Sequence, residues 1–84
     1  MGAESAKRLL VDIYRQSGGR TRKRIDRKMT QKALDMSDEE MHQAVTELVT
    51  DKFIRYDDGD PGPTLSMTPQ GIAEAERHLV KPAH

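Results

Sequence analysis

The clearest pattern of hydrophobic and polar positions lies in residues 37–54. Its apolar residues recur at i, i+3, i+4, i+7 and i+8, the spacing that lines one face of an α-helix: Met41, Ala44, Val45, Leu48 and Val49. Ser37 precedes this stripe and Glu40 follows three residues later, which is the pattern of a capping box. The segment therefore predicts a helix from about Asp38 to Asp51 with one face in a core.

Two segments near the ends of the chain show the same helical spacing. In the first, the apolar positions are Ala6, Leu9, Leu10, Ile13 and Tyr14. Ser17-Gly18-Gly19 is expected to end this helix, because glycine readily takes the left-handed conformation of a C-cap. In the second, Thr68 and Pro69 predict a helix start and Lys81-Pro82 a stop. The predicted buried face of this last helix is Ile72, Ala75 and Leu79.

The middle of the chain predicts one more helix and a hairpin. Ile25, Met29 and Ala33 give a helix a narrow buried stripe and leave its other sides basic. Residues 53–58 alternate like a strand, a Gly/Pro-rich loop follows at 59–63, and residues 65–67 form a second strand. The residues expected to be buried are Leu9, Leu10, Ile13, Ile25, Met29, Leu34, Met41, Val45, Leu48, Ile54, Leu65, Ile72 and Leu79.

This order of elements over residues 6–80 resembles the winged helix-turn-helix family of DNA-binding domains. The matching residues are Leu34-Asp35-Met36-Ser37, Met41, Val45, Leu48, Phe53-Ile54 and Met67-Thr68-Pro69-Gln70-Gly71. The resemblance implies an α+β, mostly α fold: a winged helix with three helices, a two-stranded wing hairpin and a C-terminal helix. We expect a single domain over residues 1–84, ordered from about residue 5 to residue 81.

Composition narrows the classes of protein further. At 84 residues with 35% apolar residues, the chain is long enough for one small domain with a modest core. The chain has no cysteine, which excludes disulfides, thiolate metal sites and a cysteine nucleophile. No apolar run reaches membrane-spanning length, and residues 1–12 lack the layout of a signal peptide. We therefore expect a cytoplasmic protein that does not enter a membrane.

Opposite charges are separated along the chain although the formal net charge is zero. Residues 15–32 carry a net charge of +7 and residues 35–60 a net charge of −7. The basic residues expected to contact a nucleic-acid backbone are Arg20, Arg22, Lys23, Arg24, Arg27, Lys28 and Lys32. The same segment could bind an acidic protein surface, lie against the acidic half of its own domain, or meet that of a second copy in a weak, salt-sensitive homo-oligomer.

In the winged-helix family the helix after the turn usually enters the DNA major groove. By this resemblance the base-reading candidates are His42, Gln43, Thr46 and Thr50, and the Gln43 amide can both donate to and accept from adenine. Acidic residues at the start of that helix and in the wing would repel phosphates: Asp38, Glu39, Glu40, Asp57, Asp58 and Asp60. We therefore expect affinity to come from the basic segment, and reversal of Arg22, Lys23 and Arg24 to abolish binding.

The expected function is that of a small DNA-binding protein that regulates transcription. The alternative is a winged helix that docks a basic protein partner through its acidic third helix and wing. No enzyme is expected, because the histidines lack metal-ligand spacing and no Ser/His/Asp set can be assembled from the sequence. Asp38 and His42 at i, i+4 are expected to be a surface pair, and Asp57-Asp58-Gly59-Asp60 lacks the spaced ligands of an EF-hand. No cofactor and no metal are expected.

Overall fold

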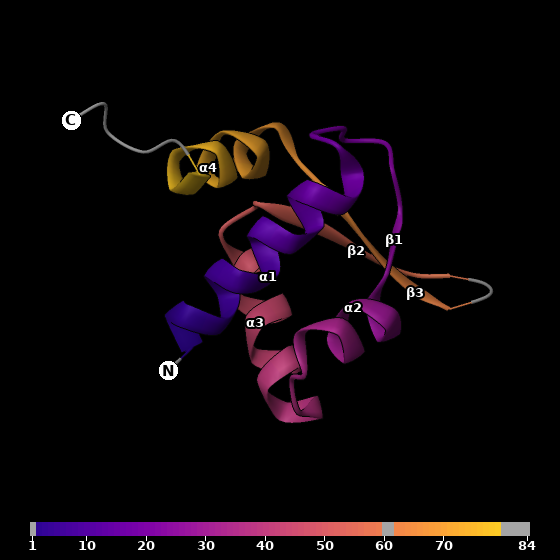
Figure 1. Ribbon diagram of the computed structural model, residues 1–84. Coiled ribbons are helices and arrows are strands. Elements are labelled where there is room, and N and C mark those ends of the chain that lie inside the picture. The colour runs from indigo at the N-terminus through magenta and orange to yellow at the C-terminus, as the bar shows by residue number, and fades with distance from the viewer. Residues whose placement is uncertain (1, 60–61, 80–84) are drawn as a thin grey trace.

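The computed structural model describes residues 2–59 and 62–79, and within them four helices surround one face of a three-stranded antiparallel sheet (Figure 1). The elements in chain order are α1 (Gly2–Ser17), β1 (Ile25–Asp26), α2 (Arg27–Leu34), α3 (Asp38–Thr50), β2 (Ile54–Asp58), β3 (Pro63–Met67) and α4 (Pro69–Leu79). The prediction of a mostly helical α+β fold is confirmed at this level. Residues 60–61 of the expected loop and the expected helix stop at Lys81-Pro82 lie outside the described residues.

Helix α1 ends as its sequence predicts. Gly18 and Gly19 have φ values of +65° and +76°, and the Gly19 N–H bonds to the Tyr14 carbonyl at 3.2 Å. Glycine takes this left-handed conformation without the steric cost that a Cβ atom brings. The helix begins at Gly2, three residues before the expected start of order at residue 5.

A three-residue turn joins α2 to α3. Asp35 is left-handed with φ +56°, and the Met36 side chain fills the core at 6% exposure. The Ser37 hydroxyl accepts from the Glu40 N–H at 3.1 Å, as the capping box predicts. In a full capping box the Glu40 carboxylate also accepts from the Ser37 N–H, whereas here it accepts from the Ser5 hydroxyl of α1 at 2.5 Å. One half of the predicted capping box is therefore wrong.

Strand β1 corrects the predicted second helix. Ile25 pairs with Leu65 of β3, and Asp26 caps α2 by accepting from the Met29 N–H at 3.0 Å. Because the helix starts only at Arg27, its buried side carries Thr30 at 1% exposure, whereas Met29 is 71% exposed. The predicted stripe of Ile25, Met29 and Ala33 is therefore wrong beyond Ile25.

The sheet has the order β1-β3-β2, and the alternation of side chains gives it two different faces. The inner face places its buried residues against the helices: Ile25, Ile54, Leu65 and Met67. The outer face carries polar residues, with Arg55 opposite Ser66 and Asp57 opposite Thr64. A polar surface with hydroxyl groups and charges of both signs therefore lies behind the core.

The core joins the inner face of the sheet to the helices, with α1 and α3 packed against each other. Leu9, Leu10, Ile13, Met41, Val45 and Leu48 are buried as predicted. Leu34, Ile72 and Leu79 are only half-buried, and Val49 is 39% exposed. Val49 therefore faces outward from α3, which corrects the predicted stripe.

Candidate nucleic-acid interface

Three of the four predicted base-reading residues lie around one hollow on the outward side of α3. His42, Thr46 and Thr50 line this hollow of about 300 Å³ together with Arg27 from the start of α2. Its remaining lining residues are Val45 and Val49 of α3 and Tyr56 of β2. We call this surface the α3 hollow. It combines hydroxyl groups, an imidazole and one guanidinium with apolar side chains.

Gln43, the fourth candidate, does not line the α3 hollow. Successive helical residues are about 100° apart, so Gln43 lies about 100° around the helix from His42. It is exposed. The structure therefore groups His42, Thr46 and Thr50 and leaves Gln43 on the adjoining surface.

The carboxylates at the start of α3 are partly held by neighbouring helices. The Glu40 carboxylate accepts from Ser5 of α1, and Asp38 Oδ1 accepts from Gln31 Nε2 of α2 at 2.7 Å. Glu40 lies on the opposite flank of α3 from Val49, because nine residues at about 100° each turn the chain by half a circle. Of this acidic triad, Glu39 alone has no side-chain hydrogen bond among the described residues, and it is exposed. None of these three residues lines the α3 hollow.

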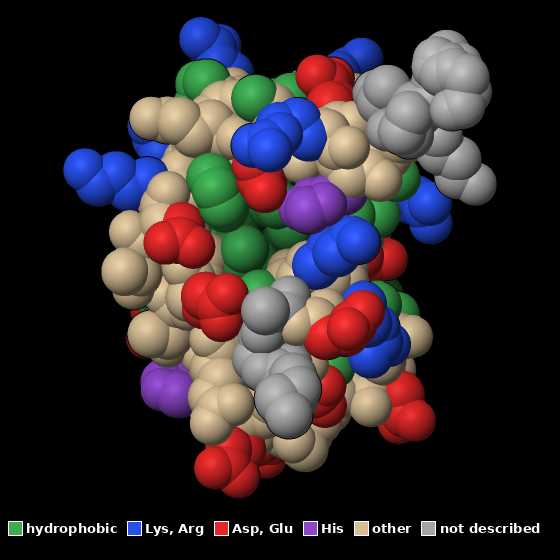
Figure 2. Space-filling view, turned by 90° about the vertical axis from the view of Figure 1, so that its left-hand side faces the viewer, with side chains coloured by type: hydrophobic (Ala, Val, Ile, Leu, Met, Phe, Trp, Pro, Cys, Tyr) green, Lys and Arg blue, Asp and Glu red, His purple; other side chains and the backbone are tan. Residues whose placement is uncertain are grey.

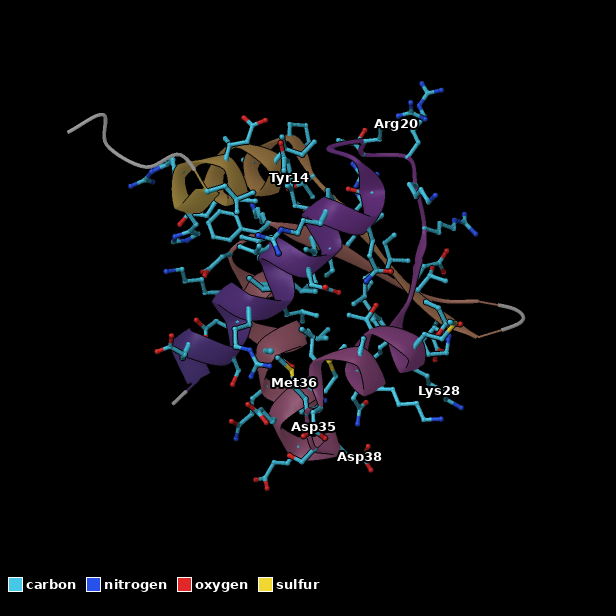
Figure 3. The ribbon with its side chains drawn as sticks, viewed as in Figure 1. Tyr14, Arg20, Lys28, Asp35, Met36 and Asp38 are labelled. Carbon is cyan, nitrogen blue, oxygen red and sulfur yellow. The ribbon has the colours of Figure 1, made fainter. Side chains whose placement is uncertain are left out.

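The basic segment divides into two groups on either side of β1. Figure 3 shows Arg20 where the chain leaves α1 and Lys28 on α2. Arg27, Lys28 and Lys32 of α2 line a shallow hollow of about 440 Å³ beside Asp38, and Arg27 also lines the α3 hollow. The other group comprises Arg20, Arg22, Lys23 and Arg24, all exposed in the loop before β1. The seven basic residues therefore do not form one continuous surface.

A third surface lies where α1 begins and α4 ends. In Figure 2 this face shows Lys and Arg side chains interspersed with Asp and Glu, so neither charge dominates it. Tyr14 of α1 donates its phenol hydrogen to Glu76 of α4 at 2.9 Å. This hydrogen bond raises the pKa of Tyr14, and partial desolvation and the charge of Glu76 act in the same direction. The bond ties α4 to the C-terminal end of α1.

Sequence reasoning missed the apolar part of the α3 hollow. Val49 was assigned to the core and Tyr56 to a strand without a role, yet they are 39% and 44% exposed at this surface. The helical spacing could have shown that Val49 is exposed, because a residue at i+8 lies about 80° around a helix from the residue at i. Met41 and Val49 therefore cannot share the centre of one face.

Comparison with models of protein families, with curated proteins and with solved structures finds no match to this chain. Within residues 2–59 and 62–79, no group of three or more His, Asp or Glu side chains is placed to hold a metal ion. None of the described helices has the length and apolar character needed to cross a membrane.

Proposed function

We propose that this chain is a winged-helix domain that binds duplex DNA through α3 and regulates transcription. The observation that carries the proposal is the placement of His42, Thr46 and Thr50 beside the Arg27 guanidinium on one exposed surface. The order of a helix, a turn, a second helix and a hairpin supports the same proposal. Here α3 is the helix that enters the major groove, and β2 and β3 form the wing.

The chemistry of these side chains suits the two parts of DNA recognition. Threonine hydroxyls and the imidazole of His42 can donate to or accept from base edges. Arg27, Lys28 and Lys32 on α2 can neutralise phosphates beside the groove, which supplies most of the affinity. This assignment moves the phosphate contacts from the loop at residues 20–24, where the sequence suggests them, to α2. Arg27 is the reason, because it alone of the basic segment adjoins the α3 hollow.

Two triple variants of equal charge test the proposal. One replaces Arg27, Lys28 and Lys32 by Gln, and the matched control replaces Arg22, Lys23 and Arg24 by Gln. Each phosphate contact contributes about −0.9 to the slope of log K against log salt, so the α2 variant should flatten that slope by about 3. The loop variant should keep the parent slope, because Arg22 and Arg24 line a different hollow from the one at α3. Fluorescence anisotropy with a mixed-sequence duplex at several salt concentrations measures both slopes.

Three results would decide against this reading. Absence of duplex binding by the parent protein at low salt would remove the DNA-binding function. Loss of the slope in the loop variant alone would return the phosphate contacts to Arg22, Lys23 and Arg24. An equal decrease of the salt slope in both variants would mean that the protein binds DNA through charge spread over its surface. Thermal melting of both variants establishes first that each is folded.

Protein contact is the second candidate function. Val49 and Tyr56 are 39% and 44% exposed within the α3 hollow, and large apolar side chains are enriched where proteins meet. A basic partner would face exposed carboxylates of α3 and the wing, among them Glu39 and Asp58. A nitrogen-15 NMR titration with duplex DNA separates the two candidate functions. If the protein contacts only other proteins, adding DNA will leave the Thr46 and Thr50 amide signals unshifted.

A further inference from the structure

A second hollow lies on the outer face of the sheet, away from α3. It has a volume of about 410 Å³ and is lined by Thr21, Arg22, Arg24, Arg55, Tyr56, Asp57, Thr64 and Ser66. We call it the outer hollow. Strand register explains its composition, because Arg55 pairs with Ser66 and Asp57 with Thr64 on the face opposite the core. Pairing of β1 with β3 brings the loop before β1 to the same place.

The outer hollow has an excess of positive charge. Its lining residues include three arginines from two segments that lie far apart in the sequence, and Asp57 is their one carboxylate. Arg24 Nη2 lies 3.6 Å from Asp57 Oδ2, with the two side chains 69% and 53% exposed, so this pair is weak and easily displaced. Within residues 2–59 and 62–79, Arg22 and Arg55 have no carboxylate within 4.0 Å. Two guanidinium groups are therefore available to a ligand.

The donors in the outer hollow suit phosphate groups. A guanidinium presents its N–H groups as a planar fork that matches two phosphate oxygens at once, and an oxyanion strengthens each bond. Thr64 and Ser66 are half-buried and add hydroxyl donors from the central strand. Arginines come from the loop and from β2, so a ligand must offer acceptors in both directions to engage them together.

We propose that the outer hollow binds a diphosphate group, two linked phosphoryl units, as a free anion or as part of a nucleotide. One phosphoryl unit meets Arg22 and Arg24 of the loop, and the other meets Arg55. The hydroxyl groups of Thr64 and Ser66 bond to the oxygens that face the sheet. This site lies on the opposite face of the sheet from α3 and is lined by other arginines than the α3 hollow, although Tyr56 lines both.

A nitrogen-15 NMR titration with pyrophosphate at constant ionic strength tests the site. Saturable shifts are expected at the Thr64 and Ser66 amides, while the Thr46 and Thr50 amides of α3 remain in place. Arg22→Gln and Arg55→Gln should each weaken binding at least tenfold. Lys23→Gln is the matched control, because Lys23 lies between Arg22 and Arg24 in the sequence but does not line the outer hollow. It should leave the affinity within twofold.

Titrations with other anions distinguish a free diphosphate from a nucleotide as the ligand. A nucleoside diphosphate that binds like pyrophosphate supports recognition of the phosphates alone, and one that binds more tightly supports a nucleotide as the ligand. Orthophosphate and sulfate should bind at least tenfold more weakly. Equal affinity for all these anions would overturn the diphosphate assignment.

Other outcomes would overturn the site itself. These are the absence of a saturable shift, an equal loss of affinity in Lys23→Gln, or shifts confined to α2 and α3. No DNA is present in this titration, so it can fail while duplex binding holds, and the reverse is equally possible. The exposed positions of Arg22 and Arg55 make misfolding of the variants easy to exclude by comparing their melting temperatures with that of the parent.

Discussion

Replacing Gly71 by Ala is a sharp test of how α4 is seated on the core. Gly71 is buried, and a Cβ atom added there would lie 1.8 Å from the Phe53 carbonyl oxygen and 2.7 Å from the Phe53 carbonyl carbon. Real Cβ contacts almost never fall below 3.0 Å, and the opposing atoms are backbone rather than the end of a flexible side chain. Either α4 or the turn before β2 must therefore move by about 1 Å, the gap between the built contact and an allowed one.

The size of the effect follows from what that movement disturbs. The Phe53 carbonyl accepts from the Thr68 N–H at 3.2 Å, and the Thr68 hydroxyl donates to the Lys52 carbonyl at 2.6 Å. Overpacking costs about 1–3 kcal/mol and a weakened hydrogen bond about 0.5–1.5 kcal/mol. Gly→Ala inside an unobstructed helix would instead stabilise by about 0.5–1 kcal/mol. We expect a net loss of about 2–3 kcal/mol, or at least about 8 °C in melting temperature.

Thermal unfolding followed by far-ultraviolet circular dichroism measures this loss. Gln70→Ala is the control, because Gln70 is the exposed neighbour on the same helix and its replacement should change stability by less than about 0.5 kcal/mol. Helix propensity and steric clash predict opposite signs for Gly71→Ala. A variant that melts at or above the parent temperature would therefore refute the close approach of α4 to Phe53.

Three further outcomes are expected. Leu48→Ala should destabilise the fold by about 2–5 kcal/mol in chemical unfolding, because Leu48 is 3% exposed. Val49→Ala on the same helix should cost less than about 1 kcal/mol. Equal losses would place Val49 in the core. The pKa of Tyr14 is raised above its ordinary value near 10, so stability should fall as the pH rises past 10 through the higher folded-state pKa. The Tyr14→Phe variant should lack that part of the fall. Urea unfolding at several pH values measures both. If α3 reads DNA as proposed, Val49 and Tyr56 can contact a thymine methyl group. Replacing thymine by uracil should then weaken duplex binding about fourfold, which corresponds to the burial of one methyl group. Unchanged affinity for every such duplex would exclude that contact.

Local signals in the sequence were sufficient for most of α3. The Ser37 cap, the spacing from Met41 to Leu48 and the following strand depend on residues close in the chain, and the structure has all three. The error at Val49 comes from the geometry of the helix itself. At about 100° per residue, eight residues return to a position about 80° from the start, so the stripe drifts off the core within two turns.

The second helix was harder to predict because a tertiary contact decides where it begins. Ile25 has helical spacing to Met29, yet it pairs with Leu65, a residue forty positions later in the chain. A two-residue strand is too short to show an alternating pattern. Asp26 did carry a local signal, since Asp before a helix is a favoured N-cap, and it predicts the start at Arg27 that the structure has.

The same short strand decides what the basic segment can do. Between Arg24 and Arg27 the chain passes through β1, and pairing with β3 directs the loop to the outer face of the sheet while α2 turns toward α3. One run of basic residues thus supplies two surfaces, which a count of charges along the sequence cannot reveal. Tyr56 lines both the α3 hollow and the outer hollow, but the two hollows are lined by different arginines. We therefore expect pyrophosphate and duplex DNA to bind together without competing, since neither occupies the guanidinium groups that the other requires.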